Sequence, residues 1–198
     1  RHLSIPKERY LDETNFGLAE KNKIWIETAI ELSIENIKKL IQSTGIRCEE
    51  IDHVTSTTVT GIAVPSIEAL VMNKFPFRND VKRNPSFGLG CMGGTAGLTR
   101  IADYLVGHPQ DTALLLSVEL CSLTFQLQDT SVANIVSSQL FGDGSTGVLL
   151  GGIHHPKAAE ASAKMLGYKS HFFRNTESVM GWELNPQGFQ IRLLPEIP

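Results

Sequence analysis

Cys91 is the residue whose type and setting are best suited to catalysis. It follows a strand-like run at 84–90 and opens a glycine-rich segment at 92–98 that has helical spacing. A thiol at such a junction lies near unpaired helix N–H groups and the positive end of the helix dipole, and both favour the reactive thiolate. The glycines after it would leave room for a bulky substrate. These features predict a nucleophile for acyl transfer, although a lone cysteine is more often a small core residue.

The elements that must position Cys91 alternate along the chain. Apolar residues at helical or strand spacing, with Gly45 ending the first helix, define them. The predicted elements are helices at 18–43, 65–71, 92–106 and 130–139, and strands at 52–59, 84–90, 112–119 and 144–151. After Lys164 the pattern changes to shorter runs, at 165–170 and 189–194. The order predicts a mixed α/β layer fold, with helices packed on a mostly buried sheet.

The composition is that of one globular domain. The 198 residues are 41% hydrophobic and 20% charged, which is enough for a sizeable core. A net charge of −3 gives no sign of nucleic acid or an anionic membrane as a partner. Cys48, Cys91 and Cys121 are widely spaced, so we expect neither a disulfide framework nor a metal site. With no leader segment and no long apolar run visible, we expect a cytoplasmic protein.

The segment around Cys91 resembles a known enzyme family. The run 90–97, Gly-Cys-Met-Gly-Gly-Thr-Ala-Gly, is similar to the active-site segment of type III polyketide synthases, the chalcone synthase-like branch of the thiolase fold. The similarity continues through further blocks in the same order, namely 60–65, 117–125, 140–144, 180–182 and 193–198. It implies a bacterial member and a thiolase-like layered fold. It also implies that residues 1–198 form an N-terminal condensing-enzyme domain, the first half of a subunit trimmed at both ends.

The resemblance implies a role for individual residues. Cys91 matches the nucleophile that takes an acyl group from a coenzyme A thioester. Phe141 matches an aromatic gatekeeper, and Ile191 stands where a second gatekeeper aromatic usually sits. The positions that match the wall of the substrate pocket are Thr60, Glu119, Cys121 and Thr124. On residue type alone, these would be core or strand-end residues and, for Glu119, a solvated charge.

Two further residues match positions outside that pocket. Val64 corresponds to the side chain that reaches through the dimer interface into the partner's cavity, although it could equally be an apolar residue before a helix. Arg1 falls near basic residues that bind the phosphates of coenzyme A. The resemblance therefore implies a homodimer with acyl-CoA and malonyl-CoA as substrates and with no cofactor.

The mechanism implied by the resemblance is stepwise. An acyl group moves to Cys91, malonyl-CoA loses carbon dioxide, and the resulting enolate attacks the acyl thioester. In the family a His and an Asn stabilise the enolate, and both would lie beyond residue 198. We therefore expect this chain at most to be acylated. Small to medium residues at Thr60, Val64 and Cys121 favour a fatty acyl starter and a pyrone or resorcinol product.

Two other hypotheses stay open. One is a priming-type ketoacyl carrier-protein synthase of the same fold. Glu119, the loop 60–65 and the block 180–182 favour the polyketide branch over it. The other is a non-catalytic binding or dimerisation module that has kept the fold, which the intact surroundings of Cys91 oppose.

Overall fold

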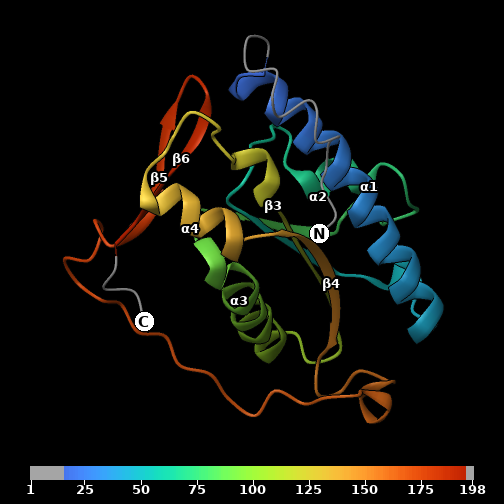
Figure 1. Ribbon diagram of the computed structural model, residues 1–198. Coiled ribbons are helices and arrows are strands. Elements are labelled where there is room, and N and C mark those ends of the chain that lie inside the picture. The colour runs from blue at the N-terminus through green and yellow to red at the C-terminus, as the bar shows by residue number, and fades with distance from the viewer. Residues whose placement is uncertain (1–15, 195–198) are drawn as a thin grey trace.

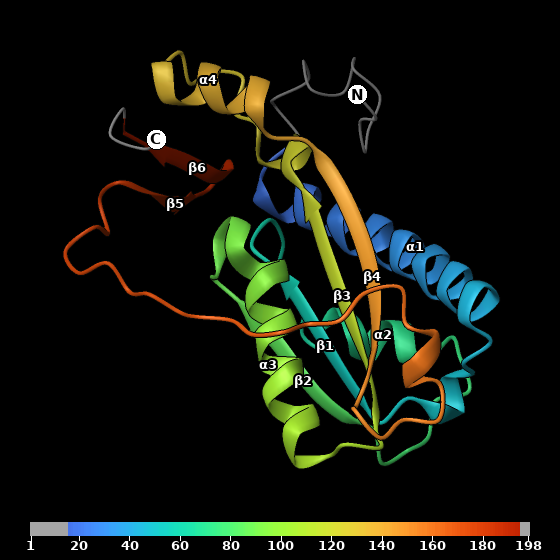
Figure 2. The same ribbon diagram turned by 90° about the horizontal axis from the view of Figure 1, so that it is seen from below.

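A four-stranded sheet lies between two layers of helices in the computed structural model, which describes residues 16–194. The helices are α1 (Leu18–Thr44), α2 (Ile67–Met72), α3 (Gly93–Gly107) and α4 (Val132–Leu140). The strands are β1 (His53–Thr58), β2 (Lys82–Phe87), β3 (Thr112–Leu120), β4 (Asp143–Gly151), β5 (Met180–Asn185) and β6 (Gly188–Leu193). The sheet has the order β2-β1-β3-β4, with β4 antiparallel to the other three strands. Figures 1 and 2 show α1 and α2 on one face and α3 on the other.

Helix α1 packs on one face of the sheet, against β3 and β4. Every fourth side chain is buried, and these are Lys21, Trp25, Ala29, Ser33 and Ile37. Their common core contains Val54 of β1 and both Leu114 and Leu116 of β3. Gly45 ends the helix with a φ of 66°, and its amide donates to the Ile41 carbonyl at 2.9 Å. The long predicted helix and its glycine stop are therefore confirmed.

Helix α3 packs on the opposite face of the sheet. Its Ile101 and Leu105 form a second core cluster with Ala113 and Leu115, the β3 side chains that alternate with those facing α1. A Cβ at Gly97 would lie 2.6 Å from Leu115 Cδ1, so this glycine lets the helix approach the strand closely. The expectation that the glycines after Cys91 leave room for a substrate is therefore wrong for Gly97, which faces the core.

The C-terminal part is less regular. Residues 161–178 are exposed and cross below α3 in Figure 1 before reaching the hairpin β5–β6, which packs beside α4. The predicted run at 189–194 is β6, whereas the run at 165–170 forms no regular element. Its Leu166 is 90% exposed and pairs with no strand, so nothing in the described residues buries its apolar side chains.

Backbone chemistry explains where predicted and observed boundaries differ. The strand predicted at 84–90 ends earlier, at Phe87, because Gly88 and Gly90 have φ values of 86° and 57° that a strand cannot contain. The helix predicted from Pro65 begins at Ile67, since Ser66 still has extended backbone angles. Within the described part of the chain, no helix combines the length and the apolar character that crossing a bilayer requires.

Candidate active site

Cys91 lies in the turn between strand β2 and helix α3. It is the middle residue of a 3-10 turn, Gly90–Met92, which follows β2 and leads directly into α3. Its side chain is exposed, so a substrate in solution can reach the sulfur. The predicted strand-to-helix junction is therefore confirmed, and the thiol precedes the amino end of a 15-residue helix.

The other two cysteines have surroundings that disfavour ionisation. Cys48 is buried, and burial together with the charge of Glu49 raises its pKa to about 11. For Cys121, burial is the main cause of a pKa of about 12, and the charges of Glu119 and Asp143 add to it. Both groups are therefore thiols at neutral pH. Of the three free cysteines, Cys91 is the exposed one.

Glu119 and Thr60 form the polar centre of the predicted pocket wall. The Glu119 carboxylate accepts hydrogen bonds from the Val59 amide at 3.0 Å, the Thr60 hydroxyl at 2.7 Å and the Thr58 hydroxyl at 3.4 Å. Burial raises the pKa of Glu119, and these hydrogen bonds oppose the increase. The solvated charge that residue type alone would suggest is therefore wrong, because Glu119 is half-buried and held by three donors.

Cys121 and Thr124 lie in the turn that follows. They begin and end a 3-10 turn directly after β3, and the Thr124 hydroxyl donates to the Cys121 carbonyl at 2.8 Å. The Ser122 amide and hydroxyl both donate to the carboxylate of Asp143 at 2.8 and 2.7 Å, which ties this turn to the start of β4. Cys121 thus lies beside the Glu119 carboxylate, as its raised pKa reflects.

The topology places these residues at one end of the sheet. Strands β1, β2 and β3 are parallel, and the register pairs Thr58 with Phe87 and Thr57 with Ser117. The three carboxyl ends therefore lie side by side, and Cys91, Thr60 and Glu119 follow or close them. The carboxyl ends of parallel strands are where open α/β sheets bind their ligands.

The two predicted gatekeepers lie on neighbouring elements. Phe141 is half-buried directly after α4, and its amide donates to the Ser137 carbonyl at 2.8 Å. Ile191 is buried on β6, opposite Trp182 in the hairpin, and β6 packs against α4. The gatekeeping role of both residues stays a prediction.

Val64 and Arg1 are separate from this group. The Val64 side chain is 95% exposed on the loop between β1 and α2, so it points away from its own core. Arg1 lies outside the described residues. The structure therefore agrees with an outward-facing role for Val64 and says nothing about Arg1.

Two residues of α1 that sequence reasoning missed also reach the site. The Trp25 indole N–H donates to the Thr60 hydroxyl at 3.2 Å, and the Lys21 ammonium, 8% exposed, donates to the Phe125 carbonyl at 2.9 Å. Lys21 and Thr60 line a small pocket together with Leu123 and other residues of α1 and β6. The signal available in the sequence was that Lys21 precedes Trp25 and Ala29 at helical spacing, which places a cation on the same helix face as those two apolar residues.

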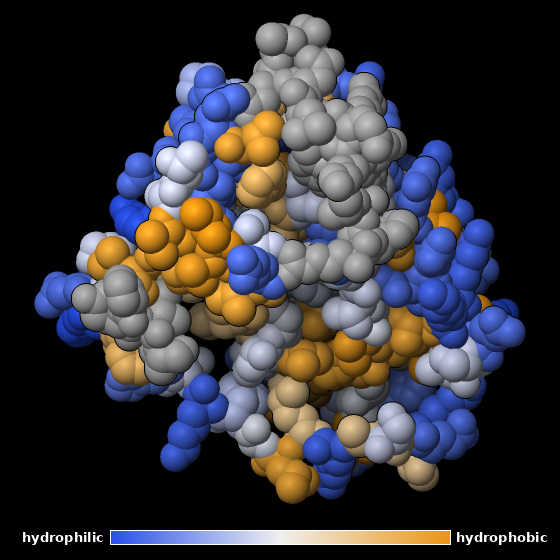
Figure 3. Space-filling view, viewed as in Figure 1, coloured by the Kyte–Doolittle hydropathy of each residue, from blue (hydrophilic) through white to orange (hydrophobic). Residues whose placement is uncertain are grey.

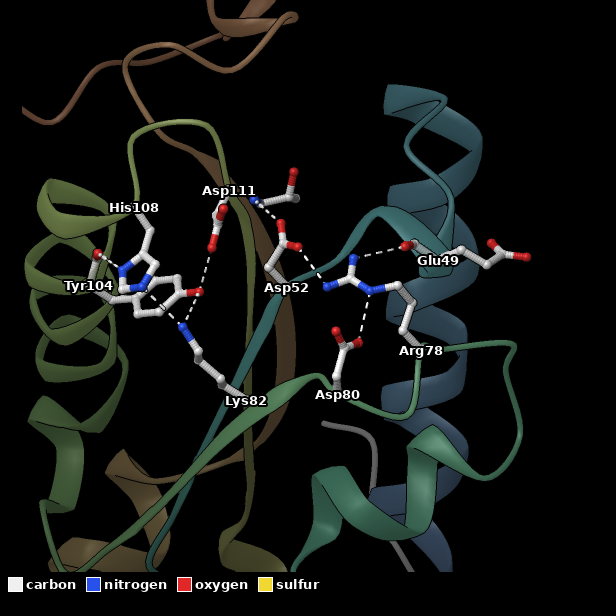
Figure 4. A network of polar contacts seen from close by, with 9 residues as sticks. Glu49, Asp52, Arg78, Asp80, Lys82, Tyr104, His108 and Asp111 are labelled. Atoms are coloured by element: carbon white, nitrogen blue, oxygen red, sulfur yellow. Dashed lines mark hydrogen bonds and ion pairs between the residues drawn. The ribbon is translucent and has the colours of Figure 1, made fainter.

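A second polar cluster lies at the amino ends of the same strands, away from Cys91 (Figure 4). The Lys82 ammonium lies 3.0 Å from Nε2 of His108, and the Tyr104 hydroxyl donates to Asp111. On its other side Arg78 donates to Asp52, at 2.9 Å. These contacts join β1, β2 and the end of α3, so the cluster holds the sheet together. Among residues 16–194, no group of three His, Cys, Asp or Glu side chains is placed to hold a metal ion.

Known proteins resemble this chain in both sequence and structure. Residues 6–153 match the family model of the N-terminal domain of chalcone and stilbene synthases. The 1,3,6,8-tetrahydroxynaphthalene synthase of Streptomyces peucetius subsp. caesius is 41% identical over 198 residues, which cover 100% of this chain and 52% of the relative. A putative chalcone synthase of Bacillus subtilis strain 168 is 36% identical over 206 residues, covering 100% of this chain and 56% of the relative.

A solved structure gives the same result. The crystal structure of 1,3,6,8-tetrahydroxynaphthalene synthase from Streptomyces coelicolor A3(2), described as a bacterial type III polyketide synthase, has a TM-score of 0.90 and 25% identity. The match covers 100% of this chain and 55% of that one. The chain thus spans about half the length of the relatives that it matches. It belongs to the chalcone and stilbene synthase family of type III polyketide synthases, and it has the thiolase-like fold of the family's N-terminal domain.

Proposed function

We propose that Cys91 accepts an acyl group from a coenzyme A thioester, and that the protein extends this group with malonyl-CoA as a type III polyketide synthase. The observation that carries the proposal is the exposed sulfur of Cys91 at the carboxyl ends of three parallel strands, the end of the sheet where Thr60 and Glu119 also lie. Family membership supports the same reaction class.

The chemistry follows from the nucleophile. The Cys91 thiolate attacks the thioester carbonyl, a carbon–sulfur bond forms, and coenzyme A leaves as its thiolate. Malonyl-CoA then loses carbon dioxide, and its enolate carbon attacks the acyl–Cys91 carbonyl. The new carbon–carbon bond expels the Cys91 thiolate, which is ready to take the longer chain back. An apolar Phe141 would help to exclude water from this decarboxylation.

We propose a fatty acyl group as the starter and a pyrone or resorcinol as the product. This proposal rests on the modest size of Thr60, Val64 and Cys121, which would leave a pocket long enough for an alkyl chain. A series of saturated acyl-CoA thioesters tests it through the rate of acylation, and we expect medium and long chains to react faster than acetyl-CoA. A fastest reaction with malonyl-CoA or acetyl-CoA would contradict the fatty starter while leaving the polyketide reaction intact.

We also propose that the protein acts as a homodimer. Two features support this proposal. Val64 is 95% exposed, and among residues 16–194 β2 is an edge strand of the sheet, which is a position where another strand can pair. The outer face of α4 also carries exposed apolar side chains, which Figure 3 shows as a patch; they are Val132, Ile135, Val136 and Leu140. Exposed apolar patches of this kind mark contact surfaces.

Carbon dioxide release tests the reaction class. A subunit that contains this chain together with the His and Asn expected of the family is incubated with acyl-CoA and labelled malonyl-CoA, or with acyl-CoA and labelled malonyl carrier protein. Preference for malonyl-CoA supports a polyketide synthase, whereas preference for the carrier protein would favour the priming ketoacyl synthase. For the 198-residue chain alone we expect acylation of Cys91 without carbon dioxide release. Failure of Cys91 to accept any acyl group would favour the non-catalytic module.

A further inference from the structure

Helix α1 carries an aromatic side chain that reaches the pocket wall from behind. Trp25 is 1% exposed, and its ring packs against Gly61, where any Cβ would overlap it. Its indole N–H points to the Thr60 hydroxyl at 3.2 Å. A buried indole needs a partner for this N–H, and here the partner is Thr60, a buried polar residue of the predicted pocket wall.

The hydrogen-bonding capacity of Thr60 fixes the direction of its own proton. A threonine hydroxyl can donate one hydrogen bond and accept two. The oxygen of Thr60 accepts from the Trp25 indole at 3.2 Å and from the Leu120 amide at 2.9 Å. Both acceptor positions are therefore occupied, and the hydroxyl hydrogen is left for Oε2 of Glu119, at 2.7 Å.

Glu119 receives only donors from these neighbours. The Val59 amide and the hydroxyls of Thr58 and Thr60 all donate to its two oxygens. These donors favour the ionised form of the carboxyl group and oppose burial, which is the largest cause of the raised pKa of Glu119. Each donor thus contributes to stabilising the ionised form of Glu119 and to fixing the position of its carboxyl group.

We propose that Trp25 is a positioning residue, which makes Thr60 a one-way donor and so holds the Glu119 carboxylate in place on the pocket wall. The consequence for acyl transfer rests on the proposed function. A fixed carboxylate gives the pocket a fixed shape beside Cys121, so an acyl-CoA thioester meets a preformed site when it approaches Cys91.

The first test is a titration. The side-chain carboxyl of Glu119, assigned by its absence in Glu119→Gln, is followed by carbon NMR in the wild-type chain, in Trp25→Phe and in Ile37→Val. Trp25→Phe keeps an aromatic ring but removes the N–H, and Ile37→Val trims the same buried stripe of α1 three turns away. We expect the midpoint of Glu119 to move to higher pH in Trp25→Phe and to stay unchanged in Ile37→Val. An unchanged midpoint in folded Trp25→Phe would overturn the proposal.

A second variant protects the test against misfolding. Replacing Trp25 by 3-benzothienylalanine, in a Trp182→Phe background, keeps the shape of the indole and exchanges its N–H for a sulfur. The same upward movement of the midpoint is expected. In a Thr60→Val background, where the bond to Glu119 is already lost, neither Trp25 change should move the midpoint further, because Trp25 acts on Glu119 only through Thr60. A full additional shift in the double variant would contradict the relay through Thr60.

The last readout concerns acyl transfer. We expect Trp25→Phe to raise the acyl-CoA concentration that half-saturates Cys91 loading by roughly fivefold, with the maximal rate kept, as loss of one hydrogen bond in binding would do. An unchanged half-saturation would overturn the positioning role. The titration involves no acyl transfer, so it can support the relay even if the wild-type chain takes no acyl group. Conversely, normal loading with an unmoved midpoint would leave the proposed function standing and remove Trp25 from it.

Discussion

The local environment of each thiol makes the three cysteines different reagents. Cys48 and Cys121 have pKa values raised to about 11 and about 12, both mainly by burial, while Cys91 is exposed on a turn before α3. Because the thiolate is the nucleophile, reactivity at neutral pH should concentrate on Cys91. Cys121 lies close enough to the pocket wall to serve as an internal comparison.

We predict selective alkylation of Cys91. At about pH 8, iodoacetamide should label Cys91 at least tenfold faster than Cys121 or Cys48, because only a small fraction of the Cys121 and Cys48 thiols is ionised at that pH. Peptide mapping after short exposure measures the three rates in one sample. Equal rates at Cys91 and Cys121 would show that exposure and burial do not control reactivity here.

His53 gives the protein a predicted pH dependence. Its side chain is 7% exposed, and burial, followed by the charges of Lys82 and His108, lowers its pKa below the ordinary 6.5. The carboxylates of Asp52 and Asp111 oppose the shift only in part. The unfolded chain therefore takes up a proton near pH 6.5 while the folded chain does not. Stability is fully present above that pH and falls as the pH is lowered toward the depressed folded pKa.

Urea unfolding at about pH 7.5 and about pH 5.5 measures this effect. We expect the urea concentration at the wild-type unfolding midpoint to be lower at the lower pH. The decrease should be smaller in His53→Leu. His171→Gln, at an exposed histidine in the irregular segment, is the matched control and should behave as the wild type does. A fall as large in His53→Leu as in the wild type would assign the effect to other groups.

At the level of elements, the close contact of α3 with the sheet positions Cys91. The helix begins directly after the Cys91 turn, and Gly97 lets it lie against Leu115. A shift of α3 would move the turn with it. The glycine-rich run thus places the nucleophile through packing.

Gly97→Ala tests this packing. The added Cβ would lie 2.6 Å from Leu115 Cδ1, and such overpacking costs about 1–3 kcal/mol of unfolding free energy. Gly107→Ala, at the last residue of the same helix, meets no atom within 4 Å and should be neutral or slightly stabilising. Urea unfolding compares the two variants. Equal stability of both would mean that α3 can move without cost.

Periodicity predicted most elements because each buries one face. The helical spacing of apolar residues in α1 and the apolar run of β3 identified two elements, and Cys91 could be placed at a junction from its neighbours alone. Contacts between distant segments could not be predicted in this way. The bonds from Trp25 to Thr60 and from Thr60 to Glu119 join residues 35 and 59 positions apart, and no local pattern encodes them. The structure of the run at 165–170 could not be predicted for the same reason, because an apolar stretch does not reveal which segment, if any, packs against it.

At the scale of the whole molecule, apolar surface remains uncovered. Leu140 of α4 is 69% exposed, and Phe172 and Phe173 in the irregular segment are 79% and 69% exposed. Val64 is more exposed than any of these and extends from a loop near the carboxyl end of β1. Such surfaces suit contact with further protein, in line with the homodimer proposed above.

Val64→Asp separates folding from association. Because the side chain is 95% exposed, an aspartate there should leave the free energy of unfolding of a monomer within about 0.5 kcal/mol. In a dimer it would bury an unpaired charge, which is costly. We expect monomers in analytical ultracentrifugation, whereas Ile153→Asp, at a 70% exposed position after β4, should keep the wild-type state. An unchanged dimer in Val64→Asp would place the interface elsewhere.

Site-mapped acylation tests the central claim most directly. The wild-type chain is incubated with a long-chain acyl-CoA and then digested. The mass of each cysteine-containing peptide is measured by mass spectrometry. We predict that the acyl mass appears on the peptide of Cys91, that Cys48 and Cys121 stay unmodified, and that Cys91→Ala takes no acyl group while Cys121→Ala still does. An acyl group found first on Cys121, or loading that persists in Cys91→Ala, would contradict Cys91 as the nucleophile.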